Sequence, residues 1–360
     1  MLYVLSEALL YCCYAILTGV SILALLPDNK KPRYHISDNT LTWVLLGIVL
    51  LSLVQVIKII VFYKEILGYD IPYLLFTVLS DYKIGNAWFT TVITAMVMLL
   101  FLGLKPNSKA IKYKWKAIPI LTLILLIAFG YASHSASLYG WSGFAAHTTH
   151  FVSAMVWIGV LFVVGWFTVE LKNWSPFLKW FSPMAIVCVS LNIIAGLLLM
   201  SRLSPYYVSS WITSFGQAML IKHLLIVPII ALALINTFLL RKESNKTLSW
   251  MRAESIVIII LLVVTAFMGQ QEPPHGDLTT ILDDGPPLPW FTYISGFDVS
   301  RGEDMEIIPN VASLCLAAAG IIAILGGLLW SWKKKMAIWS VSAALFFVIC
   351  GYLALMFSIA

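Results

Sequence analysis

Ten long apolar runs restrict the fold of this chain more than any other feature of its sequence. Each has roughly 17–25 residues, the length that a helix needs to cross the hydrocarbon core of a bilayer. There, only a helix or a closed barrel satisfies its own backbone hydrogen bonds. We predict an all-α, polytopic transmembrane helical bundle whose spans lie near residues 3–26, 41–62, 87–104, 117–133, 143–168, 183–200, 217–240, 254–270, 310–331 and 337–358.

Composition supports this class. Of the 360 residues, 61% are hydrophobic and 11% are charged, whereas a soluble domain has about 25% charged residues.

The apolar segment 71–80 contains Pro72 and is too short to span, so we interpret it as interfacial. The first run has no basic leader or small-residue cleavage site, and we expect it to be retained. The five cysteines lie in apolar stretches without a CxxC motif, which favours a packing role.

The distribution of basic residues predicts the orientation. Seventeen of the 23 Lys and Arg residues lie in alternate connections, namely 27–40, 105–116, 169–182, 241–253 and 332–336. Because basic residues near helix ends stay in the cytoplasm, these connections should face inside and both termini should be extracellular. Lys58 and Lys222 fall within spans, close enough to the outer interface to extend their ammonium groups into it.

We divide the chain by sequence into N-terminal helices (1–116), a core of five helices (117–270), an external connection (271–309) and a C-terminal helical hairpin (310–360). The external connection carries eight acidic residues and is rich in Pro and Gly. It is either a solvated surface loop or a lid whose negative field attracts cations.

Five of the six histidines are predicted at or near the external ends of helices. His134 closes the fourth span, while His147 and His150 open the fifth and share one helical face. His223 lies about two turns into the seventh span, and His275 follows the eighth. Ionisable groups in membrane spans usually face the bundle interior and mark a site.

Two interpretations of these histidines remain open. Each could make an interfacial hydrogen bond, or His134, His147, His150 and His223 could share a metal or cofactor, with His275 as a further ligand. Met155 and Met219 lie near this set, and thioether with neutral imidazole suits copper(I), although methionine is also a common core residue. The sequence has no P-loop, dinucleotide fingerprint, H-E-x-x-H motif or nucleophile elbow, which disfavours nucleotide-driven and hydrolytic chemistry.

Residues from about 118 to 272 resemble the copper-resistance CopD (PcoD) family of inner-membrane proteins, which includes the YcnJ-type uptake proteins. The resemblance rests on three groups of residues: Gly130–Tyr–Ala–Ser–His134; His150, Trp157 and Gly159 in the fifth span; and Phe215–Gly216, Lys222 and Asn236 in the seventh. Three positions depart from the family pattern, where Phe215 replaces Tyr, Ser133 replaces Gly, and His147 stands where an acidic residue is expected.

The resemblance implies copper transport, with uptake as the direction, or copper handling at the plasma membrane. A transporter or metal-binding membrane protein is favoured over an enzyme, although the sequence leaves this open. The resemblance also implies a site built from His134, His150, His147 and His223, shaped by Lys222, Trp157 and Asn236. An extracytoplasmic copper chaperone could act as a partner, since no soluble β-domain is present in this sequence. Ligand imidazoles bind only when unprotonated, so uptake should weaken as pH falls.

Two other functions use the same residues. Paired histidines could ligate haem b in an electron-transferring cytochrome, although two of them share one helical face near a hairpin end, which suits a compact metal site better. An assembly factor that delivers copper or haem to a respiratory oxidase is the third interpretation. An absorption spectrum with a metal analysis distinguishes the copper transporter from the haem protein.

Overall fold

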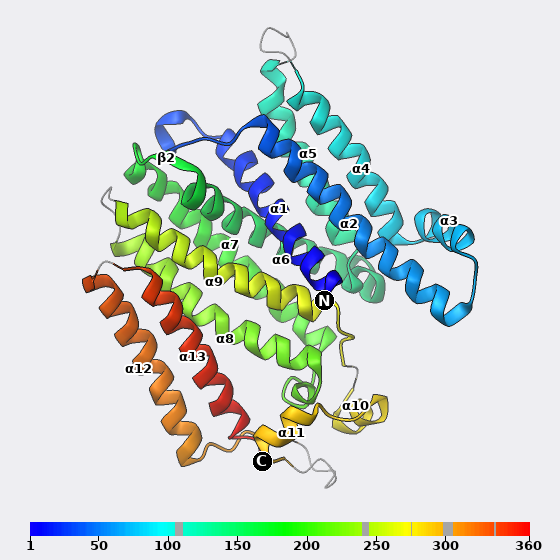
Figure 1. Cartoon of the computed structure of the whole chain (residues 1–360), viewed down its shortest axis with the longest axis vertical. Helices are drawn as coiled ribbons and strands as arrows, with labels where there is room; N and C mark the ends of the chain where they lie inside the picture. The colour runs from blue at the N-terminus through cyan, green and yellow to red at the C-terminus, as the bar shows by residue number, and fades with distance from the viewer. Residues whose placement is uncertain (105–110, 240–244, 275, 298–304, 335) are drawn as a thin grey trace. The chain divides into compact units, whose positions relative to one another are not determined.

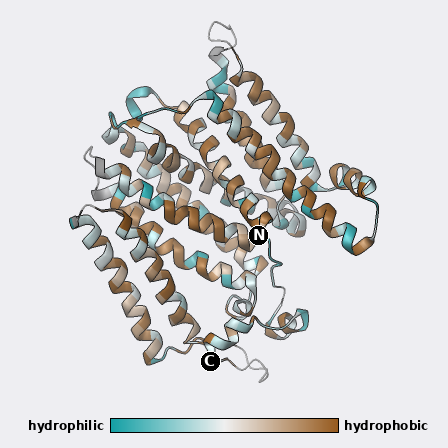
Figure 2. Ribbon diagram, viewed as in Figure 1, coloured by the Kyte–Doolittle hydropathy of each residue, from teal (hydrophilic) through white to brown (hydrophobic). Residues whose placement is uncertain are grey.

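The computed structural model describes residues 1–104, 111–239, 245–274, 276–297, 305–334 and 336–360, and most of them are helical (Figure 1). Within these described ranges, ten helices are long and apolar enough to cross a membrane, which confirms the predicted class. Figure 2 shows apolar residues along their lengths and polar residues gathered toward the connections. The spans are α1 (Leu2–Ala24), α2 (Asp38–Leu67), α4 (Lys83–Leu102), α5 (Ile111–Tyr131), α6 (His134–Phe167), α7 (Trp174–Leu203), α8 (Ser214–Leu234), α9 (Asn245–Gly269), α12 (Val311–Lys334) and α13 (Ile338–Met356).

Shorter elements fill the connections. Helix α3 (Ile71–Asp81) is the predicted eleventh apolar segment, and it buries Leu74 and Val78 while most of its other residues stay exposed. Its length does not suffice to span. The remaining elements are α10 (Leu278–Asp284), α11 (Pro289–Ser295), the 3₁₀-helices η1 (Asp28–Lys30) and η2 (Ser209–Ile212), the π-helix η3 (Ile235–Leu239), and strands β1 (Arg33–Tyr34) and β2 (Thr168–Glu170).

The chain forms two compact units, Met1–Leu199 and Met200–Ala360. The boundary lies within α7, inside the segment 117–270 that the sequence grouped as one core.

In the first unit, the predicted inside connections meet at one end. Strands β1 and β2 pair antiparallel and join the first connection to the fifth. The Lys114 ammonium lies 2.7 Å from the Asp38 carboxylate and joins the third connection to the first. All three are connections that the alternation of basic residues predicts to face inside, so their common end is the predicted cytoplasmic end.

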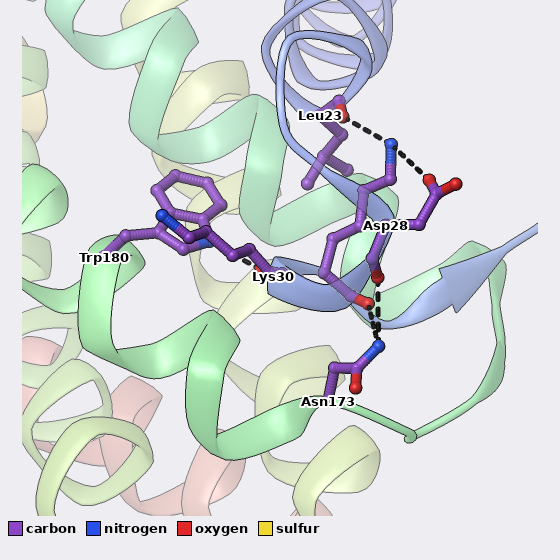
Figure 3. A network of polar contacts seen from close by, with 6 residues as sticks. Leu23, Asp28, Lys30, Asn173 and Trp180 are labelled. Atoms are coloured by element: carbon purple, nitrogen blue, oxygen red, sulfur yellow. Dashed lines mark hydrogen bonds and ion pairs between the residues drawn. The ribbon is translucent and has the colours of Figure 1, made fainter.

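A polar network ties the first connection to the start of α7 (Figure 3). The Asn173 side-chain amide donates to the backbone carbonyls of Asp28 (2.9 Å) and Lys31 (3.4 Å). The Trp180 indole N–H donates to the carbonyl of Lys30 at 2.8 Å. Asn173 has a φ of 67°, a left-handed conformation that asparagine tolerates better than most residues. The connection is therefore fixed by side chains that satisfy its backbone carbonyls.

The opposite end of this unit holds the other connections. The Gln55 amide donates to the Tyr3 carbonyl at 3.3 Å, and the Lys83 ammonium donates to the Ala136 carbonyl at 2.6 Å. The alternation of the spans predicted from sequence is thus reproduced in the packing.

In the second unit, the external connection is packed rather than simply solvated. Leu278 and Ile281 of α10 and Phe291 of α11 are buried in one apolar cluster with Trp211 of η2 and Met356 of α13. The backbone N–H of Leu288 donates to the Ile212 carbonyl at 3.0 Å. The acidic residues lie on the chain around this apolar core, with Asp298, Glu303 and Asp304 outside the described residues.

Helices α1 and α6 approach through paired glycines. A Cβ on Gly19 would collide with the carbonyl of Gly159, and a Cβ on Gly159 would collide with the carbonyl of Ala15. Small residues allow such backbone contact where helices pack in a membrane.

We predict that Gly19→Ala destabilises the protein by about 1–3 kcal/mol or more, since the added methyl group must displace backbone rather than a flexible side chain. Thermal unfolding in detergent measures the change. Gly326→Ala is the matched control within a span, because a Cβ there meets open space. Equal melting temperatures for the two variants would contradict the close approach.

A second prediction concerns the start of α10. Asp277 caps this helix by accepting from the backbone N–H of Thr280 at 3.0 Å, and this bond with the Thr279 and Thr280 hydroxyls lowers its pKa to about 2. Because the folded pKa lies below the ordinary 3.8, the stabilisation is present above that value and is lost as pH falls toward 2. The protection of the α10 amides, measured relative to their intrinsic exchange rates at each pH, should decrease across this window. Asp277→Ala should remove the pH dependence, while Asp284→Ala, at the other end of α10, should keep it.

Candidate metal centre

The sequence-predicted ligands fall into the two units. His134, His147 and His150 belong to α6 in the first unit, and His223 belongs to α8 in the second. His275 lies outside the described residues. Both His150 and His223 lie about two and a half turns (~14 Å) inside their spans, counted from Trp141 and Ser214.

His150 is locked to α7 by two hydrogen bonds with one residue. Its Nδ1 lies 3.0 Å from the backbone carbonyl oxygen of Asn192, and the Asn192 side-chain amide donates to the His150 carbonyl at 2.8 Å. A carbonyl oxygen only accepts, so Nδ1 carries the hydrogen and Nε2 carries the lone pair. This is how histidine ligands are oriented in metal sites, with one nitrogen bound to a carbonyl and the other directed to the metal.

The ring of His150 is also confined sterically. A Cβ added to Gly196, one turn after Asn192, would lie 3.3 Å from Cε1 and 3.4 Å from Nδ1 of the ring. Glycine at this position gives the imidazole the room that it occupies.

His147 has different neighbours from His150, although the two residues share a helical face. Its ring lies 6.1 Å from that of Phe129 on α5 and is stacked with Phe151 at 6.5 Å and 16°. Both phenylalanines contact Tyr11 and Tyr14 of α1. His147 is therefore at the edge of an aromatic cluster between α1, α5 and α6, whereas His150 faces α7.

The predicted place of His134 needs correction. Helix α5 ends at Tyr131, so His134 does not close the fourth span but is the first residue of α6, where it is exposed. The Ser133 hydroxyl accepts from the Ala136 N–H at 3.2 Å and starts this helix. Gly140, with a φ of 56°, then kinks the chain before the straight part of α6. This N-cap assigns His134 to the start of the following helix rather than to the end of the fourth span.

In the second unit, His223 pairs with Tyr207. The tyrosine hydroxyl lies 2.8 Å from Nδ1, and the rings are 5.4 Å apart in an edge-on arrangement. Tyr207 lies between two spans, and burial raises its pKa to about 12, so its hydroxyl stays protonated at neutral pH. When Nδ1–H of His223 donates to this hydroxyl, Nε2 carries the lone pair and can bind a metal. When the hydroxyl donates to Nδ1 instead, Nε2 carries the hydrogen and cannot bind a metal.

The remaining predicted residues are mostly buried. Met155 and Trp157 on α6 and Met219, one turn before His223, have exposed fractions of 1%, 8% and 5%. Lys222 beside His223 is half-buried.

Asn236 lies away from His223. It is in the π-helix η3, 13 residues further along the chain or ~20 Å along the helix axis. Its amide donates to the Glu254 carboxylate at 2.6 Å. Sequence reasoning did not single out Glu254, since it was placed at the boundary of the eighth span, whereas α9 begins nine residues earlier.

In neither unit do the predicted histidines that the structure describes come together in one metal-binding cage. Among the described residues, no group of three or more His, Cys, Asp or Glu side chains is close enough to hold a metal ion. A site at His150 or His223 would need other donors, such as methionine sulfur, which suits copper(I).

Two family models match the chain. Residues 175–268 match the model described as copper resistance protein D, and residues 1–144 match the model described as copper resistance protein D-like, N-terminal domain. The first match covers Asn192, His223, Asn236 and Glu254, while the second covers His134 but ends before His147.

Two curated relatives are similar over 53% of this chain. One is the copper transport protein CutJ of Bacillus subtilis (strain 168), which is 28% identical over 204 residues, or 37% of its own length. The other is the inner membrane protein YebZ of Escherichia coli (strain K12), which is 22% identical over 210 residues, or 69% of its length. The matched part therefore spans little more than a third of CutJ. No solved structure matches the chain.

We predict that Gly196→Ala disturbs the His150 ring. In the unaltered protein, nitrogen NMR of labelled histidine should show one ring with protonated Nδ1 and unprotonated Nε2, assigned by its loss in His150→Gln. The Gly196→Ala variant should shift this signal because the added methyl group presses on Cε1. Gly103→Ala is the control, since its Cβ meets only ordinary contacts. An unshifted signal in Gly196→Ala would contradict the packing described here.

Proposed function

We propose that this chain, which belongs to the copper resistance protein D family and is a multi-pass protein of the plasma membrane, carries copper across that membrane. The matches to both family models support copper handling, and the relative CutJ is named a copper transport protein. Uptake is the proposed direction, because the candidate imidazoles lie toward the predicted external ends of their helices.

The observation that carries the proposal is the fixed tautomer of His150. Binding a metal requires an unprotonated ring nitrogen that points the same way in the empty and the loaded protein. The Asn192 carbonyl holds the proton on Nδ1, and the Asn192 amide prevents α6 from turning relative to α7 at that level. His150 thus has the orientation of a ligand without depending on the metal for it.

The other donors complete the proposed path. His134, exposed at the start of α6, and His147, one turn before His150, would receive the ion on entry. Met155 would supply sulfur deeper in α6, with Trp157 limiting access by water. In the second unit, His223 with Met219 would form a second position, with Lys222 setting the local charge.

Copper(I) is the proposed cargo because imidazole and thioether are its preferred ligands. An extracytoplasmic chaperone would deliver it at the external face. Since protonated imidazole cannot bind a metal, binding should weaken as pH falls through the histidine range.

We predict that His150→Ala removes one high-affinity copper(I) from the purified protein and lowers copper accumulation in cells. His35→Ala is the matched control, because His35 is exposed at the opposite end of the first unit. Asn192→Leu keeps the backbone carbonyl that binds Nδ1 and removes only the hydrogen bond from the side-chain amide to the His150 carbonyl, so we expect a smaller loss of copper affinity than in His150→Ala. Normal copper stoichiometry in His150→Ala would refute the assignment.

The absorption spectrum of the same preparations separates this function from its rivals. A copper(I) carrier should be colourless. A Soret band with sharp reduced peaks would instead show haem b ligated by histidines. Loss of oxidase activity in a deletion strain with unchanged cell copper would favour an assembly factor.

A further inference from the structure

A buried carboxyl group in the second unit takes no part in the proposed copper path. Glu254 of α9 has an exposed fraction of 1%, and Asn236 of η3 has one of 7%. The Asn236 amide donates to Glu254 Oε2 at 2.6 Å. Glu254 lies nine residues after Asn245, which places it ~14 Å along α9 from the predicted cytoplasmic end.

The pair contains more acceptors than donors. Glu254 Oε1 and Asn236 Oδ1 are both buried and have no hydrogen-bond partner among the described residues. The ion pairs of that part of the chain include none to Glu254. Buried oxygen acceptors that lack a donor are costly unless a cation or a proton satisfies them.

Among the described residues, no charged side chain forms an ion pair with Glu254, although Lys333 of α12 follows Trp332, whose ring lies 6.1 Å from that of Trp250, one turn before Glu254. Helix α13, which packs against α9, has no charged residue. Helix α8 carries Lys222 and His223, more than a dozen residues from Asn236 and therefore ~20 Å away along the axis.

On α9 itself, Arg252 is two residues from Glu254 and so projects from nearly the opposite face. Lys246 lies two turns before Glu254, or ~12 Å along the axis. Arg241, Lys242 and Glu243 lie outside the described residues.

We propose that Glu254 is a proton-binding site in the inner half of the second unit, positioned by Asn236. An ionised carboxylate without a facing cation is far more costly to bury than a neutral acid, so the packed state holds the proton. When this end of the unit opens to water, the carboxylic acid releases its proton and becomes a carboxylate. The two states differ by one charge, and nothing is oxidised or reduced.

Resting on the proposed function, we further infer that this exchange accompanies copper transport. A copper(I) ion that enters the apolar interior brings one positive charge, and a proton that leaves Glu254 removes one. When the ion passes Glu254 on its way inward, the carboxylate left by the departing proton faces one positive charge, so the pair is neutral at that point. Copper binds at imidazole and sulfur toward the outer end of the spans, and the proton binds at a carboxylate toward the inner end.

The first experiment tests the proton site without copper. Infrared spectra of the purified full-length protein at neutral pH should show the carbonyl band of a protonated carboxyl group. This band should shift in heavy water and be lost in Glu254→Gln. The glutamine has the same shape and keeps an oxygen for the Asn236 amide. Glu272→Gln is the matched control, because Glu272 is exposed just beyond the same helix. Asn236→Leu should retain the band at a shifted frequency, since only the hydrogen bond is removed.

Three outcomes would overturn the proton site. The first is a carboxyl band that is unchanged in Glu254→Gln. The second is an ionised Glu254 whose spectrum depends on sodium or potassium, which would indicate that a metal cation occupies the site. The third is the absence of chemical label in the following experiment. If Glu254→Gln does not fold, the unaltered protein can be labelled with dicyclohexylcarbodiimide, which modifies protonated buried carboxyl groups. Label on the α9 peptide that decreases as pH rises supports the proposal, and absence of label refutes it.

The second experiment tests coupling in vesicles that contain a pH-sensitive dye. Copper(I) entry into the lumen through the unaltered protein should alkalinise the lumen in step with transport, because one proton leaves for each ion that enters. Glu254→Gln should bind the same amount of copper while this pH change is lost. A persistent pH change in Glu254→Gln would overturn the coupling. If the unaltered protein shows the carboxyl band but transports no copper, the transport function fails while the proton site stands.

Discussion

Polar groups inside an apolar bundle must find partners there, and this constraint organises the structure. Lipid and packed apolar side chains offer no hydrogen bonds, so an unpaired polar group costs more than in a soluble protein. His150 with Asn192 joins α6 to α7, Asn236 with Glu254 joins η3 to α9, and Tyr207 with His223 joins the connection before α8 to that helix. Each pair fixes the orientation of an ionisable side chain and at the same time joins elements.

These pairs divide the chemistry of the chain by type. The histidine pairs leave a ring nitrogen able to bind a soft ion, while the glutamate pair leaves hard oxygen acceptors. In the second unit both types occur on one helix pair, with His223 toward one end and Asn236 toward the other. Close glycine contacts serve the same bundle in another way, since Gly19 and Gly159 bring backbones together and Gly196 makes space for the His150 ring.

The sequence predicted the spans because hydrophobic length is a local property. All ten were found, and β1 with β2 and the Lys114–Asp38 ion pair agree with the predicted alternation of ends. Boundaries were less predictable, because capping decides them. The Ser133 cap starts α6 at His134, so His134 belongs to a different helix from the one predicted. Helix α9 begins nine residues before Glu254, so Glu254 lies inside the span rather than at its predicted boundary. The external connection looked solvated because its acids are conspicuous, while Leu278 and Phe291 bury it.

The sequence by itself determined a membrane bundle, the alternation of its spans and the identity of the histidines and methionines that suit copper. Only the tertiary structure decided which neighbour each side chain meets. His147 and His150 share a helical face, yet one packs among aromatic rings and the other binds a backbone carbonyl of α7. Periodicity gives the direction in which a side chain leaves its own helix, but its partner depends on how other helices pack, and that is set by contacts between residues distant in the sequence.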